Sequence, residues 1–203
     1  SITMNRCFFF LACSLVSFSA FAQIDTNAYR TVANSIQRKY APDKRSVYFH
    51  VRFKADSVFV ESTSEQAVQA FEKSFPENHG TKLSAVVLPA KQLNQMTYGV
   101  TTISVANNRS QAFHGAELMT QTLLGTPIQI LKKQGGFYLV KSPDGYLAWT
   151  DGGAIAPMDQ AAFKAWQAAK KIVYLNDYGH ALAKPELSSA RVSDLVAGNI
   201  LKY

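Results

Sequence analysis

The pattern of hydrophobic and polar residues between positions 25 and 95 predicts a small α+β unit. Helices are indicated where hydrophobic residues recur three and four positions apart, and strands where they alternate with polar residues. The expected elements are a helix at 25–41, strands at 47–54 and 58–61, a helix that opens at Ser62, and a strand at 83–88. Ser62 followed by Glu65 has the spacing of a capping box at the start of the second helix.

Beyond residue 100 the pattern changes to short strands separated by turn residues. The expected strands lie at 101–105, 117–122, 127–131, 137–141 and 146–150. The polar stretch 107–115 is expected to form a long loop between the first two of them. Short strands at this spacing are typical of a small all-β barrel.

A helix is predicted at 157–171, between this barrel and the end of the chain. Its hydrophobic residues Ala162, Phe163, Trp166 and Ala169 share one face. A helix with one hydrophobic face buries it against another element. We therefore expect this helix to pack against a neighbouring domain rather than to serve as a free linker.

The end of the chain contains a weak internal repeat. Residues 119–125 align with 192–198 at a constant offset, and 172–175 stand where 101–105 stood. The second copy has no Gly-Gly turn and no last two strands before Tyr203. Half of a small barrel cannot bury a core and leaves open strand edges. Two interpretations remain: the chain is a fragment, or its last residues pack as irregular structure.

The first 22 residues have the pattern of a secretory signal peptide. Arg6 precedes a short hydrophobic run at 7–18, and Ala20-Phe21-Ala22 forms a cleavage site before Gln23. We expect an exported protein, located in the periplasm or outside the cell. The competing interpretation is a lipoprotein signal ending at Cys13, which leaves a shorter hydrophobic run than such signals use.

Composition and charge exclude several functions for the mature chain. Hydrophobic residues make up 47% of the sequence and charged residues 17%, so general disorder is excluded. Both cysteines lie in the leader, and cleavage leaves a formal charge of +6, which is +7 without Arg6. We therefore expect no disulfide, no thiol nucleophile and no cofactor or metal. Because the basic residues are scattered, we expect no nucleic-acid partner, and no membrane partner after cleavage of the leader.

Several segments resemble a bacterial SH3 domain, and more narrowly the front half of secreted NlpC/P60 cell-wall cysteine peptidases that carry tandem bacterial SH3 (SH3b) domains. These segments are residues 104–110, 116–121, 136–140 and 143–149. Asn108 departs from the pattern, which usually has a hydrophobic residue there. The resemblance implies an α+β chain with a signal peptide at 1–22, an N-terminal unit at 23–95, an SH3 domain at 98–156, a connecting helix at 157–171 and a partial second SH3 domain at 172–203.

In that family the catalytic domain would follow the second SH3 domain, so we expect no catalytic residue in this chain. The resemblance implies an exported region that positions a peptidoglycan stem peptide for a C-terminal NlpC/P60 domain. It also implies that the region recognises the free N-terminal L-alanine of that peptide. The catalytic domain would be of the γ-D-glutamyl-L-diamino acid endopeptidase type. Glu117 would pair with the ammonium group, and Tyr146 and Trp149 would contact the peptide. A solvated Glu117, a half-buried Tyr146 and a core Trp149 remain alternatives. The competing function is an envelope adaptor whose barrel binds a protein partner.

Overall fold

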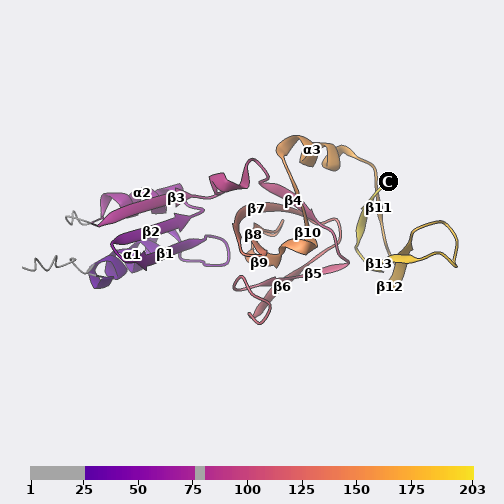
Figure 1. Cartoon of the computed structure of the whole chain (residues 1–203), viewed down its shortest axis with the longest axis horizontal. Helices are drawn as coiled ribbons and strands as arrows, with labels where there is room; N and C mark the ends of the chain where they lie inside the picture. The colour runs from indigo at the N-terminus through magenta and orange to yellow at the C-terminus, as the bar shows by residue number, and fades with distance from the viewer. Residues whose placement is uncertain (1–25, 76–80) are drawn as a thin grey trace, which may run out of the picture.

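The computed structural model describes residues 26–75 and 81–203. The predicted signal peptide lies outside the described residues. Figure 1 shows three parts in a row along the long axis: a small sheet with two helices, a β-barrel, and a pair of short sheets at the C-terminal end. The chain therefore has a mixed α+β architecture, as its sequence pattern predicts. The domain limits themselves stay a prediction.

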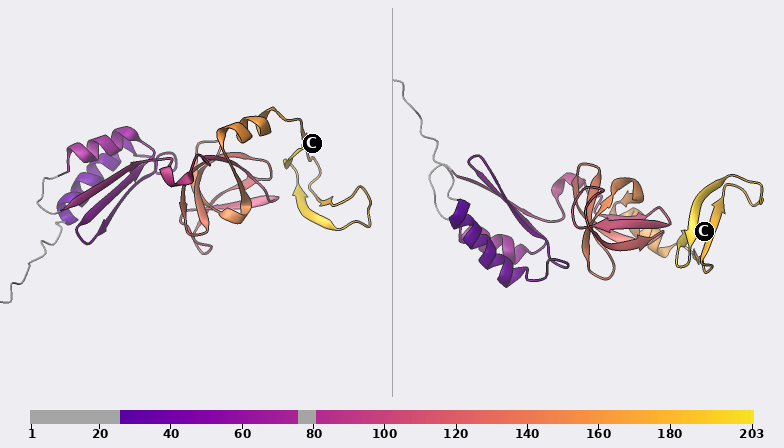
Figure 2. Two further views of the ribbon diagram at one scale, coloured as in Figure 1. Left: turned by 45° about the horizontal axis from the view of Figure 1, so that its top comes forward. Right: turned by 90° about the horizontal axis from the view of Figure 1, so that it is seen from below.

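The first part is a three-stranded sheet with both of its helices on one face (Figure 2). Its elements are α1 (Thr26–Tyr40), β1 (Phe49–Lys54), β2 (Ser57–Ser62), α2 (Glu65–Lys73) and β3 (Lys82–Val87). The strand order is β1-β2-β3, with β1 antiparallel and β3 parallel to β2. Residues Tyr29 and Phe71 from the helices meet Val58 and Val60 of the central strand in a buried core. This arrangement confirms the predicted elements of the unit.

The predicted capping box at Ser62 is wrong. Ser64 is the N-cap of α2, and its hydroxyl accepts a hydrogen bond from the Ala67 N–H at 3.2 Å. Ser62 is still part of β2, where its hydroxyl donates to the Tyr48 carbonyl oxygen at 2.7 Å. Both serines precede the helix, and the sequence alone does not reveal that the strand continues to Ser62.

Replacing Ser64 with alanine is expected to destabilise the protein by about 1 kcal/mol, because the first turn of α2 loses its acceptor. Urea denaturation of the variant measures this loss. Ser35→Ala, at an exposed position within α1, serves as the control and is expected to change the free energy of unfolding little. Equal effects of the two substitutions would contradict the assigned cap.

The barrel is a seven-stranded sheet with the order β10-β4-β7-β8-β9-β5-β6. Its strands are β4 (Tyr98–Thr101), β5 (Val105–Arg109), β6 (Leu118–Leu123), β7 (Pro127–Gln134), β8 (Phe137–Lys141), β9 (Leu147–Asp151) and β10 (Ile155–Met158). Two short 3₁₀ helices, Lys91–Leu93 and Gly152–Ala154, precede β4 and β10. The barrel class is confirmed, but the strand prediction missed β10 and placed β4 too late.

The polar residues that the sequence assigns to a long loop partly form β5. Asn108 is buried, and its side-chain oxygen accepts a hydrogen bond from the Thr150 hydroxyl at 2.6 Å. This bond satisfies a polar atom that would be costly to bury alone. At the start of β4, a side chain at Gly99 would lie 2.9 Å from the Ala156 carbonyl oxygen. The glycine permits the close approach of β10 that the hydrophobic pattern does not reveal.

The small sheet is attached to the barrel by a shared hydrophobic cluster. It contains Leu88, Ala90, Leu131, Phe137, Leu139, Leu147 and Trp149, with Tyr48, Val86 and Ala112 at its border. Two backbone hydrogen bonds cross the same junction, from the Leu147 N–H to the Arg45 carbonyl oxygen at 2.7 Å and from the Ala90 N–H to Leu131 at 2.8 Å. These contacts fix the two parts against each other.

The connecting helix α3 (Gln160–Ala168) is shorter than predicted and begins at the cap residue Asp159. Phe163 stacks on Tyr98 of the barrel, with ring centroids 4.8 Å apart. The helix has no buried residue, and Ala162 of the predicted hydrophobic face is exposed. The helix therefore rests on the surface of the barrel, where Phe163 provides its aromatic contact. Within the described residues, no helix combines the length and hydrophobicity needed to cross a membrane.

The C-terminal part repeats the pairing of the first four barrel strands. Its strands are β11 (Lys171–Val173), β12 (Tyr178–Leu182), β13 (Arg191–Val196) and β14 (Ile200–Lys202). The β4–β7 pair Tyr98↔Gln129 becomes Lys171↔Lys202, each residue 73 positions later (171 against 98, 202 against 129). The β12–β13 pair repeats β5–β6 at the same offset, including its bulge. The predicted repeat is confirmed, and the leading strand corresponds to β4 rather than to residues 101–105.

The C-terminal strands are docked on the barrel by a few polar contacts. The Ile200 N–H donates to the Leu124 carbonyl oxygen, and the amide nitrogen of Asn199 donates to the Ser104 carbonyl oxygen, both at 2.9 Å. Asn199 and Leu195 are buried. Most hydrophobic side chains of this part remain exposed, Leu175 at 81% among them. The C-terminal part is therefore attached to the barrel through a small contact area.

Candidate functional site

The loop between β5 and β6 carries the candidate binding residue Glu117. The Arg109 guanidinium donates to the Ala116 carbonyl oxygen at 2.8 Å, and the Ser110 N–H donates to the Glu117 carbonyl oxygen at 2.9 Å. These bonds close the base of the loop, while the Glu117 side chain is exposed. The carboxylate is therefore presented to solvent from a fixed backbone position.

A groove of about 420 Å³ lies where the small sheet meets the barrel, and we call it the junction groove. Its walls come from β1, β2, β7, β9 and the loop after β5. The lining residues are Tyr48, His50, Arg52, Glu61, Ser110, Gln111, Ala112, Phe113, Lys132, Gln134 and Trp149. Pockets at the meeting of two structural units are common ligand sites.

The charges in the junction groove are largely set by one ion pair across the junction. Lys132 on β7 contacts Glu61 on β2, and these side chains are only 13% and 20% exposed. Burial, and then the charge of Glu61, raise the pKa of Tyr48 to about 12. Burial, and then the charge of Lys132, lower the pKa of His50. At neutral pH both groups are therefore uncharged.

Arg52 supplies the remaining positive charge of this groove. Its guanidinium lies over the Phe59 ring, 4.9 Å from the centroid, and among the described residues it has no acidic partner within ion-pair distance. A guanidinium that is not paired by the protein can bind a carboxylate or phosphate of a ligand. With Glu61 neutralised by Lys132, the junction groove is suited to anionic groups.

A second, smaller pocket of about 150 Å³ surrounds Tyr146. It is lined by Arg45, Met119, Thr120, Tyr146 and Leu147, and the Arg45 guanidinium lies 5.6 Å from the centre of the Tyr146 ring. Tyr146 is 40% exposed. The pocket combines a hydrophobic side with a cation held over an aromatic ring.

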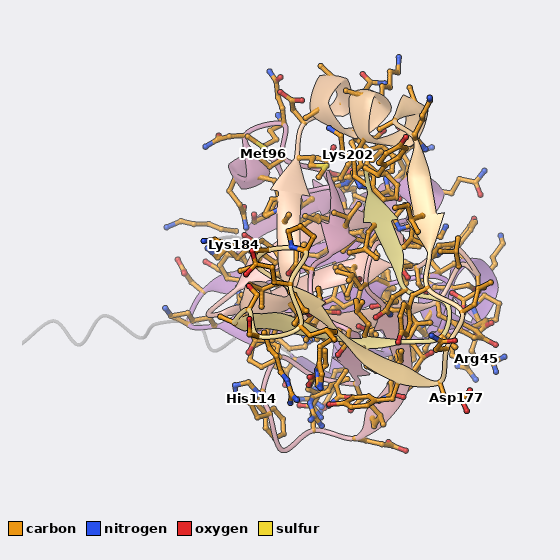
Figure 3. The ribbon with its side chains drawn as sticks, turned by 90° about the vertical axis from the view of Figure 1, so that its right-hand side faces the viewer. Arg45, Met96, His114, Asp177, Lys184 and Lys202 are labelled. Carbon is orange, nitrogen blue, oxygen red and sulfur yellow. The ribbon has the colours of Figure 1, made fainter. Side chains whose placement is uncertain are left out.

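The structure does not bring the three predicted site residues into one pocket. Trp149 is a core residue, 7% exposed, with one edge in the junction groove, and Tyr146 lines the smaller pocket. Glu117 lines neither. Figure 3 shows His114, in the same loop as Glu117, and Arg45, beside Tyr146, on different sides of the molecule. Contact of all three residues with one ligand stays a prediction.

Sequence reasoning missed the charged wall formed by Tyr48, His50, Arg52 and Lys132. One signal was available, because His50 and Arg52 alternate with the hydrophobic residues of β1 and must share the face opposite the helices. Their meeting with Lys132, more than 70 positions away, depends on how the two parts dock. Among the described residues no cluster of three metal-ligating side chains occurs. The grooves are suited to binding through charge and aromatic contact.

The barrel is similar in sequence to a known family. Residues 108–154 match the model of the bacterial dipeptidyl-peptidase SH3 domain. A solved NlpC/P60 endopeptidase from Photobacterium damselae subsp. piscicida is similar over 89% of this chain and 47% of its own, at 14% identity and a TM-score of 0.44. The chain thus spans about half the length of that protein. No curated protein matches the chain. The sequence match supports an SH3 domain of the kind found in bacterial dipeptidyl-peptidases.

Proposed function

We propose that this chain is an exported recognition region that binds the peptidoglycan stem peptide for a peptidase domain of the NlpC/P60 type. The observation that carries the proposal is the match of residues 108–154, most of the barrel, to the SH3 domain of bacterial dipeptidyl-peptidases. Binding rather than catalysis is proposed for these residues, because the described chain holds no thiol. Its partners would be the stem peptide and the C-terminal domain of such a peptidase.

Glu117 is the proposed contact for the free N-terminal amine of the peptide. Its backbone is held by the base of the loop, and its carboxylate is exposed. A carboxylate forms a charge-assisted hydrogen bond with an ammonium group, whereas an acylated amine has no charge to offer. This geometry would select peptides with an unblocked L-alanine. Tyr146, beside Arg45, would contact a more distant part of the peptide.

Replacing Glu117 with glutamine is expected to weaken binding of the tripeptide L-Ala-γ-D-Glu-meso-diaminopimelate by about tenfold, since the charge-assisted bond is lost. Isothermal titration of the chain from residue 23 onward measures the affinity. N-acetylation of the tripeptide is expected to weaken its binding to the native chain by the same factor, about tenfold. It is expected not to weaken binding to the Glu117→Gln variant any further. Glu72→Gln, an exposed carboxylate on α2, is the matched control.

Two outcomes would overturn these assignments. If the native chain bound free and acetylated tripeptides equally, Glu117 would not be the amine contact. If the native chain bound neither peptide, the proposed recognition of the stem peptide itself would fail.

A further inference from the structure

Strand β1 forms an open edge of the small sheet. It pairs with β2 alone, through a hairpin whose last pair is Lys54↔Ser57. In an antiparallel hairpin with a two-residue turn, the closing pair is hydrogen-bonded and alternate residues turn their backbone groups away. The hydrogen bond from the Thr63 N–H to the Tyr48 carbonyl oxygen, at 3.0 Å, shows that the even-numbered residues of this strand face β2. The N–H and C=O groups of Phe49, Val51 and Phe53 therefore point outward.

These outward backbone groups have no partner among the described residues. No hydrogen bond between described residues uses the backbone of Phe49, Val51 or Phe53. Unpaired groups on a strand edge are the atoms that an added strand would use. The edge is thus available to a further extended chain.

A groove of about 580 Å³ runs along this edge, between β1 and α1. It is lined by Arg30, Ala33, Asn34, Gln37, Lys44 and the β1 residues 49–53. His50 and Arg52 line both this groove and the junction groove. An added strand would therefore place alternate side chains toward α1 on one side and toward the open face of the sheet on the other.

The charge of this edge is positive throughout. Arg30 and Lys44 lie on the α1 side and Arg52 on β1, and none of the three forms an ion pair with a described residue. The Arg30 guanidinium lies 5.7 Å from the centre of the Phe53 ring. The described residues that line the groove include no aspartate or glutamate. A ligand with acidic groups on both faces would match this distribution.

We propose that the edge of β1 binds an extended acidic peptide by strand addition. The backbone of the peptide pairs with Phe49, Val51 and Phe53. Its acidic side chains meet Arg30 and Lys44 on the helix side and Arg52 on the open side of the sheet. Neither Glu117 nor Tyr146 lines this groove, so the proposal is argued from different residues than the proposed stem-peptide contact.

A competing role for the same basic residues is protection. Charged side chains on an edge strand can prevent pairing with other chains. That role predicts no binding of an acidic peptide, and it predicts self-association when the basic residues are removed. The two roles therefore give opposite results in one experiment.

The experiment uses the chain from residue 23 onward and the acetylated, amidated peptide Glu-Val-Glu-Glu-Val-Glu at low ionic strength. On binding, amide hydrogen exchange at Phe49, Val51 and Phe53 is expected to slow by about tenfold or more, because these N–H groups gain partners. The amides of His50 and Arg52, already bonded to β2, are expected to change little. A peptide with an N-methyl group at every residue is expected not to bind, since all of its backbone donors are blocked.

The double variant Arg30→Glu/Lys44→Glu is expected to weaken binding by about tenfold. Lys164→Glu/Lys170→Glu, at exposed positions in and after α3, has the same change of charge and is the control. The proposal is overturned if the native chain does not bind the peptide, or if the N-methylated peptide binds equally well. It is also overturned if exchange slows equally at neighbouring residues of β1, or if the control pair weakens binding as much.

Discussion

Replacing Trp149 with alanine is expected to destabilise the protein by about 3–5 kcal/mol, the cost typical of removing a buried aromatic side chain. Trp149 lies on β9 and belongs to the cluster that joins the barrel to the small sheet. Its loss would leave a cavity in this cluster, which also contains Leu88, Ala90 and Leu139. Both the barrel and its attachment to the sheet should weaken together.

Urea denaturation measures this effect. Unfolding is monitored by far-UV circular dichroism, because the substitution removes a tryptophan and changes the fluorescence signal. Trp166→Ala removes the chain's other tryptophan, which is half-exposed on α3, and is expected to cost about 1 kcal/mol or less. If the two variants lost the same stability, Trp149 would not be the core residue that the structure shows. If Trp149→Ala loses this much stability, weaker ligand binding by the variant reflects its impaired folding. It is then no evidence that Trp149 contacts the ligand.

Replacing Gly125 with alanine is expected to detach the C-terminal strands from the barrel. Gly125 has a φ of +79°, and an added Cβ would lie 2.2 Å from the Ile200 carbonyl oxygen. That distance is far below van der Waals contact and involves backbone, so Ile200 must move away. The hydrogen bond from the Ile200 N–H to Leu124 would then break, and amide exchange at Ile200 should accelerate by at least about tenfold.

Gly135 offers a matched control for this substitution. It also has a positive φ, +57°, but an added Cβ would meet nothing within 4 Å. Both alanine variants therefore bear the backbone strain of the left-handed region, about 1–2 kcal/mol. Only Gly125→Ala should release the C-terminal strands. Fast exchange at Ile200 in both variants would show that the docking depends on general barrel stability instead.

The stability of the C-terminal part follows from how much of the barrel pattern it repeats. Its strands pair with one another in the register of β4–β7, but the described chain holds no counterparts of β8 and β9. Val100 is 6% exposed in the first copy, whereas its counterpart Val173 is 50% exposed. Without covering strands, the hydrogen bonds of Asn199 and Ile200 to the barrel carry much of the attachment.

Several features of this protein are determined by the sequence alone, because they depend on neighbouring residues. The hydrophobic spacing predicts α1, α2, β1, β2 and β3, and the turn glycines predict the hairpin of β7 and β8. The internal repeat is likewise visible, since matching side chains recur at one offset and adopt the same register. The resemblance of the barrel segments to an SH3 domain is also local, and residues 108–154 match that family.

Only the tertiary structure decides where distant residues meet. Asn108 is buried on a strand because the Thr150 hydroxyl donates to its side-chain oxygen, and Gly99 admits β10 because backbones approach closely there. In the junction groove, Lys132 meets Glu61 only because the two parts dock. Local spacing cannot encode such contacts, because their free energy arises from burial and charge pairing between segments far apart in the chain.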